Sequence, residues 1–256
     1  MRSVRLLHFT DLHLFGAATA RLRGIPTLES ATAALAHARA RHWPPEAVLV
    51  SGDIVHDDPR GYAQFQRLFA ALGPPVLCLP GNHDDPDAMR RALDHPPFVT
   101  QGYADVGLWR IVLLDSVQPG QAGGALDASR LTALEEALAQ AGERPVLIAL
   151  HHHPVPMGSR WLDQVALAEP DALFAVLDRH PGVRGIVWGH VHQSFDAQRN
   201  GVRLLATPST CAQFRPRTEQ FALDPLPPAY RTLVLHADGA IDSQLHWVES
   251  GTPRGH

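Results

Sequence analysis

Short apolar runs recur along the chain, and most of them end abruptly in polar residues. Runs of about four to eight apolar residues bounded by Gly, Pro, Asn or Asp are typical of buried strands. The pattern predicts strands at residues 4–10, 47–50, 76–79, 109–114, 145–150 and 183–188. Gly52 follows the second run and permits a tight turn, which would deliver Asp53 into a cleft.

The stretches between these strands carry apolar residues at helical spacing. Residues 30–41 are rich in alanine, and residues 62–72 place Phe65 and Phe69 on one face. Asp85 before a proline, and Asp127 before a leucine-rich face, fit the first residues of two further helices. Helices are therefore predicted at residues 30–41, 62–72 and 172–177, and after residues 85 and 127.

The pattern changes in the last quarter of the chain. Asn-Gly at residues 200–201 and Asp-Gly at 238–239 each separate two strand-like runs, which predicts hairpins over 195–206 and 230–247. Residues 207–228 are rich in Pro, Thr and Arg and are expected to form a surface loop near the functional site. Strands alternating with helices, followed by strands alone, predict one α/β domain over residues 1–256, with two sheets inside and helices outside.

Composition excludes several classes of protein. The 256 residues are 45% apolar, carry a net charge of −4, and contain no lysine, so no basic face for a nucleic acid is expected. No apolar run is long enough to span a membrane. Cys78 and Cys211 form no disulfide framework, and the chain enters a strand directly after Met1, so we expect a cytoplasmic protein without a signal peptide.

Good metal ligands follow nearly every predicted strand. Carboxylate, amide and imidazole groups without a thiolate suit two hard or borderline cations such as iron, manganese, cobalt or zinc. Asp53 stands alone after its strand and is the candidate that bridges both ions. The pattern leaves open which histidine of residues 151–153 is a ligand. The full candidate set is Asp11, His13, Asp53, Asn82, His83, His151, His190 and His192.

At two places in the sequence, two candidate ligands are separated by a single residue. Asp11 and His13 form one pair, and His190 and His192 form the other. If the backbone is extended there, side chains two residues apart lie on the same face of the strand. Each pair is therefore expected to point into one site.

Together these motifs resemble the five blocks of the calcineurin-like metallophosphoesterases. The blocks are Asp-x-His at residue 11, Gly-Asp at 52, Gly-Asn-His-Asp at 81, the histidine triplet at 151 and Gly-His-x-His at 189, in the order of the family. Trp-Leu-Asp-Gln at 161, Thr-Pro-Ser-Thr-Cys at 207 and the segment from residue 230 to 239 resemble the bacterial class III cyclic AMP phosphodiesterases. The resemblance implies two mixed β-sheets flanked by helices.

The resemblance also implies a ligand set for two metal ions, iron or manganese, with zinc or cobalt as alternatives. One ion would take Asp11, His13, Asp53 and His192, and the other would take Asp53, Asn82, His151 and His190. His152 is the alternative to His151. Relatives often have His-Gly-Glu where this chain has Gly123-Gly124-Ala125, so a histidine that could reach the substrate is missing.

The implied reaction is hydrolysis of 3′,5′-cyclic AMP to 5′-AMP by a hydroxide held between the two metals and aimed in line at phosphorus. Asn82, His83 and Thr210 would contact the substrate, although a packed loop explains Thr210 as well. His83 would either hydrogen-bond a phosphoryl oxygen or protonate the leaving oxygen, while Asp84 either orients His83 or caps a helix. Cyclic GMP, 2′,3′-cyclic nucleotides or glycerophosphodiesters remain possible substrates at this point. A non-catalytic metal-binding scaffold is the alternative of another class, and the oligomeric state stays open.

Overall fold

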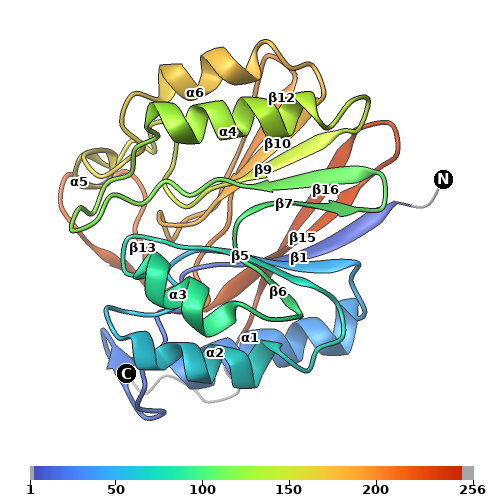
Figure 1. Ribbon diagram of the computed structural model, residues 1–256. Coiled ribbons are helices and arrows are strands. Elements are labelled where there is room, and N and C mark those ends of the chain that lie inside the picture. Colours follow the sequence, from blue (N-terminus) through green and yellow to red (C-terminus); the bar gives the residue numbers. More distant parts are fainter. Residues whose placement is uncertain (1–2, 250–256) are drawn as a thin grey trace.

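Two six-stranded mixed sheets pack face to face, with helices on both outer faces (Figure 1). The computed structural model describes residues 3–249, so the ends of the expected domain, residues 1–2 and 250–256, lie outside the described residues. The first sheet has the order β16 (Ile241–Trp247), β15 (Ala229–Leu235), β1 (Val4–Phe9), β4 (Ala47–Ser51), β5 (Val76–Leu79) and β6 (Phe98–Val99). The second has the order β11 (Phe195–Arg199), β12 (Val202–Ala206), β10 (Val183–Trp188), β9 (Val146–Ala149), β8 (Trp109–Leu113) and β7 (Gly102–Val106).

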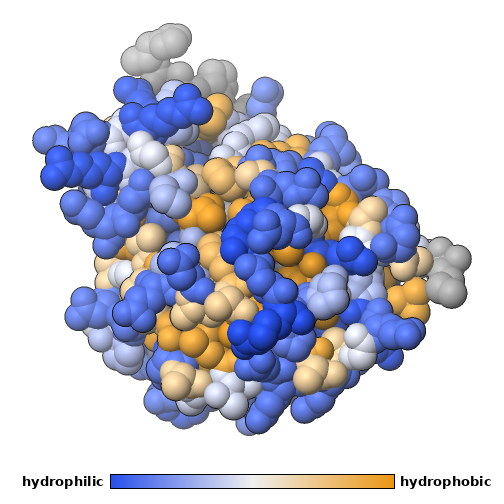
Figure 2. Space-filling view, turned by 90° about the horizontal axis from the view of Figure 1, so that it is seen from above, coloured by the Kyte–Doolittle hydropathy of each residue, from blue (hydrophilic) through white to orange (hydrophobic). Residues whose placement is uncertain are grey.

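The helices form two separate outer layers. Helices α1 (Thr27–His42), α2 (Tyr62–Phe69) and α3 (Pro86–Leu93) cover the first sheet. Helices α4 (Ala128–Ala139) and α6 (Pro170–Leu177) cover the second, and the surface over them exposes hydrophilic side chains interspersed with apolar ones (Figure 2). No helix among residues 3–249 is long and apolar enough to cross a membrane.

Three apolar clusters hold these layers together. The cluster between the sheets includes Leu49, Leu77 and Leu147, all of them fully buried. Its members come from alternate positions of the strands, whereas the other positions pack against the helices. Both faces of each parallel strand are thus buried, which explains why these strands appear in the sequence as continuous apolar runs.

The structure confirms the predicted fold class and most of its elements. Asp85 and Asp127 cap α3 and α4, as expected from their positions. Several short elements have no periodic signal and were not predicted: β7, a hairpin of β2 (Arg21–Leu22) and β3 (Ile25–Pro26), the 3-10 helix η1 (Pro59–Gly61), and α5 (Arg160–Asp163). In the segment 207–228, expected as a surface loop, residues 207–213 are buried, whereas residues 214–228 are exposed or half-buried. Within it β13 (Gln213–Phe214) pairs with β14 (Leu223–Asp224).

A series of hydrogen-bonded, buried polar side chains joins the two sheets near the carboxyl ends of their parallel strands. His8 on β1 contacts the hydroxyl of Ser51 through Nε2, at 2.7 Å, and the hydroxyl of Thr207 through Nδ1, at 2.8 Å. Arg231 Nε donates to the same Thr207 hydroxyl at 3.1 Å. Burial, with a smaller effect of the Arg231 charge, lowers the pKa of His8 to about 3. His8 is therefore neutral in the folded protein.

This neutral histidine makes stability depend on pH. Below pH 6.5 the unfolded chain binds a proton at His8 that the folded chain does not bind until about pH 3. The stability contribution is thus complete above pH 6.5 and falls by about 1.4 kcal/mol per pH unit below it. Replacing His8 by Gln should reduce the slope of the unfolding free energy between pH 6 and 4 by that amount, measured by urea denaturation of metal-free protein. Equal slopes in both proteins would contradict this assignment.

Candidate metal centre

The candidate ligands converge at one edge of the sandwich because the parallel strands end there. Strands β1, β4 and β5 of the first sheet run parallel, as do β9 and β10 of the second. Each ligand lies in the loop directly after one of these five strands, so both sheets contribute to one site. Ligands in open α/β sheets typically bind at such carboxyl ends.

The ligand-bearing loops are not extended, which corrects the expected basis for their convergence. Five candidate ligands have a positive φ: Asp11 at 54°, His13 at 49°, Asp53 at 47°, His190 at 66° and His192 at 48°. Alternation along a strand therefore does not place these pairs. Left-handed residues turn the chain sharply and aim successive side chains inward, and such strained backbone concentrates at functional sites.

Two glycines make this tight packing possible. Gly52 has a φ of 96°, and a Cβ there would lie 2.8 Å from the backbone nitrogen of Gly81. A Cβ on Gly189 would lie 2.7 Å from a carboxylate oxygen of Asp11. Both glycines permit close contact between loops of different strands, and no other residue fits without a shift of the ligands.

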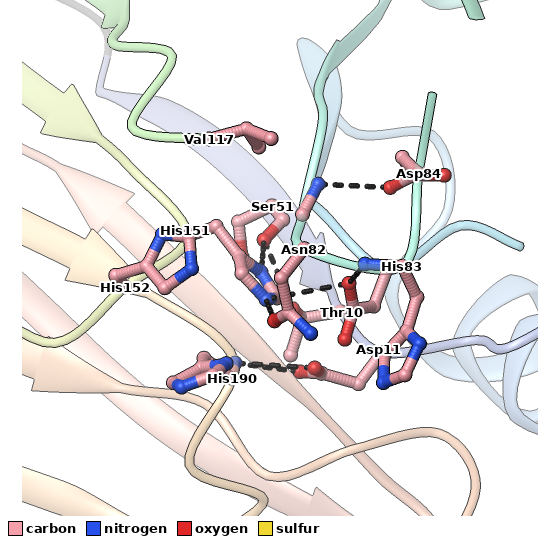
Figure 3. A network of polar contacts seen from close by, with 12 residues as sticks. Thr10, Asp11, Ser51, Asn82, His83, Asp84, Val117, His151, His152 and His190 are labelled. Atoms are coloured by element: carbon pink, nitrogen blue, oxygen red, sulfur yellow. Dashed lines mark hydrogen bonds and ion pairs between the residues drawn. The ribbon is translucent and has the colours of Figure 1, made fainter. Parts of the chain in front are cut away.

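One group of candidate ligands gathers around Asp11 and the Oδ2 oxygen of Asp53. His13 Nε2 lies 3.2 Å from His192 Nε2 and 3.7 Å from Asp53 Oδ2. His192 Nε2 lies 3.3 Å from Asp11 Oδ1. The Asp11 carboxylate also accepts hydrogen bonds from the backbone nitrogen of His190, at 3.0 and 3.1 Å (Figure 3).

A second group uses the other oxygen of Asp53. His151 Nε2 lies 3.4 Å from Asp53 Oδ1 and 3.2 Å from Asn82 Oδ1. The ring of His190 lies beside that of His151, with centroids 5.0 Å apart. The two oxygens of Asp53 thus face different sets of candidate ligands.

The outer nitrogens of three imidazoles have backbone carbonyl partners. His151 Nδ1 lies 2.8 Å from Ser51 O, His192 Nδ1 lies 2.6 Å from Ala212 O, and His190 Nε2 lies 3.0 Å from Val165 O. If each of these nitrogens carries the ring proton, the opposite nitrogen presents a lone pair to the cluster. Imidazoles and carboxylates gathered in this way fit two cations.

Burial and mutual charge control the protonation of the carboxylates. Burial acts to raise the pKa of Asp53, but the neighbouring imidazole of His151 and then that of His13 hold it well below its usual range. Burial is also the main reason that the pKa of His190 lies well below that of an exposed histidine. Burial acts to lower the pKa of His151, but the charge of Asp53 outweighs it and raises this pKa to about 9. The site therefore combines ionised carboxylates with a neutral His190 and a protonated His151, whose proton a bound metal ion would displace.

The histidine triplet separates into three environments. His151 alone contacts both Asp53 and Asn82, so the geometry favours it over His152 as the ligand. His152 Nδ1 pairs with the Ser116 hydroxyl at 2.8 Å. His153 Nε2 lies 3.5 Å from Asp163, which itself accepts hydrogen bonds from the backbone of residues 157 and 158.

His83 has a different carboxylate partner from the one expected. Its Nδ1 lies 3.1 Å from Oδ1 of Asp57, a carboxylate that is itself exposed. Asp84 points away from the His83 ring (Figure 3) and accepts from the backbone of Ile54, Val55 and Gly81 and from Tyr62 Oη. Both expected roles for Asp84 are wrong, because its carboxylate holds the loops after β4 and β5 together and Asp85 caps α3. Burial, and then the charge of Asp53, raises the pKa of Asp84 to about 6.

Thr210 lies in a packed loop and not in the substrate cavity. It is 1% exposed and is absent from the lining of the cavity over the metal centre, because residues 209–211 pack behind the loop of Asp11. The same segment contributes Ala212 and Phe214 to the cavity instead. Gly124 packs against the ring of His152, and the neighbouring Ala122 lines the cavity.

The cavity has a volume of about 610 Å³, which suits a small organic ligand. Its lining combines candidate metal ligands and His83 with a group of aromatic side chains, the aromatic end of the cavity. Neither His56, whose Nδ1 lies 3.1 Å from His13 Nδ1, nor the individual aromatic residues of the cavity were among the expected site residues. Aromatic residues in irregular loops have no periodicity that could reveal them.

Comparisons with known proteins agree with this geometry. Residues 4–194 match the calcineurin-like phosphoesterase family, and the chain belongs to that family. The 3′,5′-cyclic adenosine monophosphate phosphodiesterase CpdA of Pseudomonas aeruginosa is 42% identical over 248 residues, which cover 96% of this chain and 91% of that protein. CpdA of Escherichia coli strain K12 is 41% identical over 245 residues, covering 95% and 89%.

A solved structure supports the fold. A dimetal phosphatase from Danio rerio superimposes with a TM-score of 0.66 at 13% identity, covering 97% of this chain and 100% of that chain. Membership of the family implies a dinuclear centre of divalent metals, and the ligand clusters described above fit that centre.

Proposed function

We propose that this protein hydrolyses 3′,5′-cyclic AMP to 5′-AMP in a metal-dependent reaction. The observation that carries the proposal is the convergence of the seven proposed ligands around Asp53, in a chain 42% identical to a cyclic AMP phosphodiesterase over nearly its full length. Asp11, His13, Asp53 and His192 would hold one ion. Asp53, Asn82, His151 and His190 would hold the other.

The donor set supports iron and manganese as the metals, with zinc and cobalt as alternatives, because it contains imidazole and oxygen ligands and no thiolate. Two such ions, when bound, supply the charge that activates water and stabilises the phosphoryl oxygens in the transition state. The free, buried Cys78 and Cys211 suit a reducing compartment, so a cytoplasmic location is part of the proposal.

The chain itself supplies the proton for the leaving group. His83 lines the cavity, and Asp57 beside its Nδ1 fixes the ring so that Nε2 is left for the substrate. A proton at Nε2 can pass to the 3′ oxygen as its bond to phosphorus breaks, which avoids a poor alkoxide leaving group. Asn82 lies beside the same end of the cavity, where it can contact a phosphoryl oxygen.

A panel of substrates tests the proposal. Protein loaded with manganese would be incubated with cyclic AMP, cyclic GMP, 2′,3′-cyclic AMP and a glycerophosphodiester, and the products separated by chromatography. We expect 5′-AMP from 3′,5′-cyclic AMP at a rate well above the others. Equal or faster cleavage of another ester, or cyclic AMP opened to 3′-AMP, would contradict the proposal.

Replacing Asp57 by Asn tests the pairing with His83. The amide keeps the shape but loses the charge that orients the ring, so kcat for cyclic AMP should fall about 10- to 100-fold with metal content unchanged. Asp87, an exposed carboxylate on α3 that pairs with Arg90, provides the matched control as Asp87→Asn. An unchanged kcat in Asp57→Asn would show that His83 acts without this partner.

A further inference from the structure

The aromatic end of the cavity is a cluster of three rings that begins beside His192. The ring centroids of Trp161 and Phe214 lie 5.3 Å apart, those of Trp161 and Phe221 also 5.3 Å, and those of Phe214 and Phe221 5.2 Å. The rings meet at steep angles between 67° and 78°. All three line the same cavity as Asp53 and His83.

This end is assembled from three distant segments. Trp161 comes from α5, the two phenylalanines come from β13 and the stretch before β14, and Arg23 comes from the tip of the β2–β3 hairpin. The Arg23 guanidinium lies 4.9 Å from the centroid of Phe221 and, with Leu22, completes the rim. None of these segments belongs to the strands that carry the metal ligands.

The three rings differ in how many structural contacts each makes outside this cluster. Phe214 stacks on His192 at a centroid distance of 3.9 Å and an angle of 5°, so it also supports the metal centre. Trp161 Nε1 donates to Thr218, which anchors that ring. Phe221 is 40% exposed at the cavity mouth and makes its ring contacts only with the other members of this end, among the described residues. Of the three rings, Phe221 is the one whose position at the cavity mouth is least explained by packing within the protein.

We propose that Trp161, Phe214, Phe221 and Arg23 form the subsite for the nucleobase. This inference rests on the proposed function and names how the same cavity selects its substrate. With the phosphate held at the histidine end, the base of a cyclic nucleotide extends toward the rings, where a flat heteroaromatic group gains stacking contacts. The guanidinium at the rim donates hydrogen bonds to ring nitrogens of the base. Phosphodiesters without a base gain neither contact.

Phe221→Leu is the decisive variant, because it keeps an apolar side chain and removes the ring. We expect kcat/KM for cyclic AMP to fall about 10-fold or more, mostly through KM, since base stacking on one aromatic ring is typically worth that factor. Hydrolysis of ribose 3′,5′-cyclic phosphate, which has no base, should stay within about twofold of the unmodified protein. Phe221→Tyr, which keeps an aromatic ring at this position, should retain the preference for cyclic AMP. Leu226→Ala, at a residue on the same segment that is 45% exposed outside the cavity, should change neither substrate.

Arg23→Ala gives an independent second test, and we expect it to weaken cyclic AMP hydrolysis relative to the abasic ester in the same direction. Equal losses on both substrates in Phe221→Leu, or full activity on both, would overturn the base subsite while leaving the proposed function intact. Failure of the unmodified, metal-loaded protein to hydrolyse cyclic AMP would instead overturn the proposed function, and the base subsite with it.

Discussion

Replacing Asp53 by Asn should almost abolish turnover and remove metal from the protein. Its two carboxylate oxygens lie 3.7 Å from His13 and 3.4 Å from His151, so the one substitution affects both proposed metal sites. Removing one member of a buried charge pair typically costs about 3–5 kcal/mol. Applied to the transition state, that cost corresponds to a loss of about 10²- to 10⁴-fold in kcat.

The measurement combines the rate of 5′-AMP formation with metal analysis of the purified variant. Asp171→Asn is the control, because Asp171 is an exposed carboxylate in the first turn of α6, on the outer layer of the second sheet. The control should keep both its metal and its rate. An Asp53→Asn protein that retains full metal content and more than about a tenth of the wild-type rate would contradict a bridging role.

The second large effect is expected for His83→Asn. Loss of a positioned general acid typically costs about 10²- to 10⁴-fold in rate, so kcat for cyclic AMP should fall by that factor. Metal content should not change, because His83 is not among the proposed ligands. An aryl phosphodiester with a good leaving group needs no proton on departure, so its hydrolysis should fall much less.

The contrast between these two substrates identifies the role of His83. Equal losses on the alkyl and aryl esters would indicate that His83 binds the phosphoryl group instead of protonating the leaving oxygen. The control is His236→Gln, which should behave as wild type. His236 is a partly exposed histidine, distant from His83 in the sequence, and it pairs with Asp242. A His83→Asn protein with the wild-type rate on cyclic AMP would contradict both roles.

The sequence was informative where local physical chemistry decides the structure. Doubly buried strands must be apolar throughout, so β4, β5, β9 and β10 were visible as runs ending in candidate ligands. Asp85 and Asp127 occupy cap positions because a short carboxylate can reach the free backbone nitrogens of a first helical turn. These features need no knowledge of distant contacts.

What the sequence could not determine depends on contacts between segments far apart in the chain. Only the folded loops bring the exposed carboxylate of Asp57, and not that of Asp84, to the ring of His83. The aromatic end of the cavity needs α5, β13 and the β2–β3 hairpin to meet, and none of the three has a periodic pattern. The left-handed backbone of Asp11 and His192 is likewise set by packing between loops.

The most direct test of the dinuclear site is a titration of chelator-treated protein with manganese, following bound metal and 5′-AMP formation from cyclic AMP in the same samples. We expect no turnover without metal, saturation at two ions per chain, and activity that rises as the second ion binds. Turnover in the metal-free protein, or full activity at one ion per chain, would contradict a centre built from the ligands around Asp53.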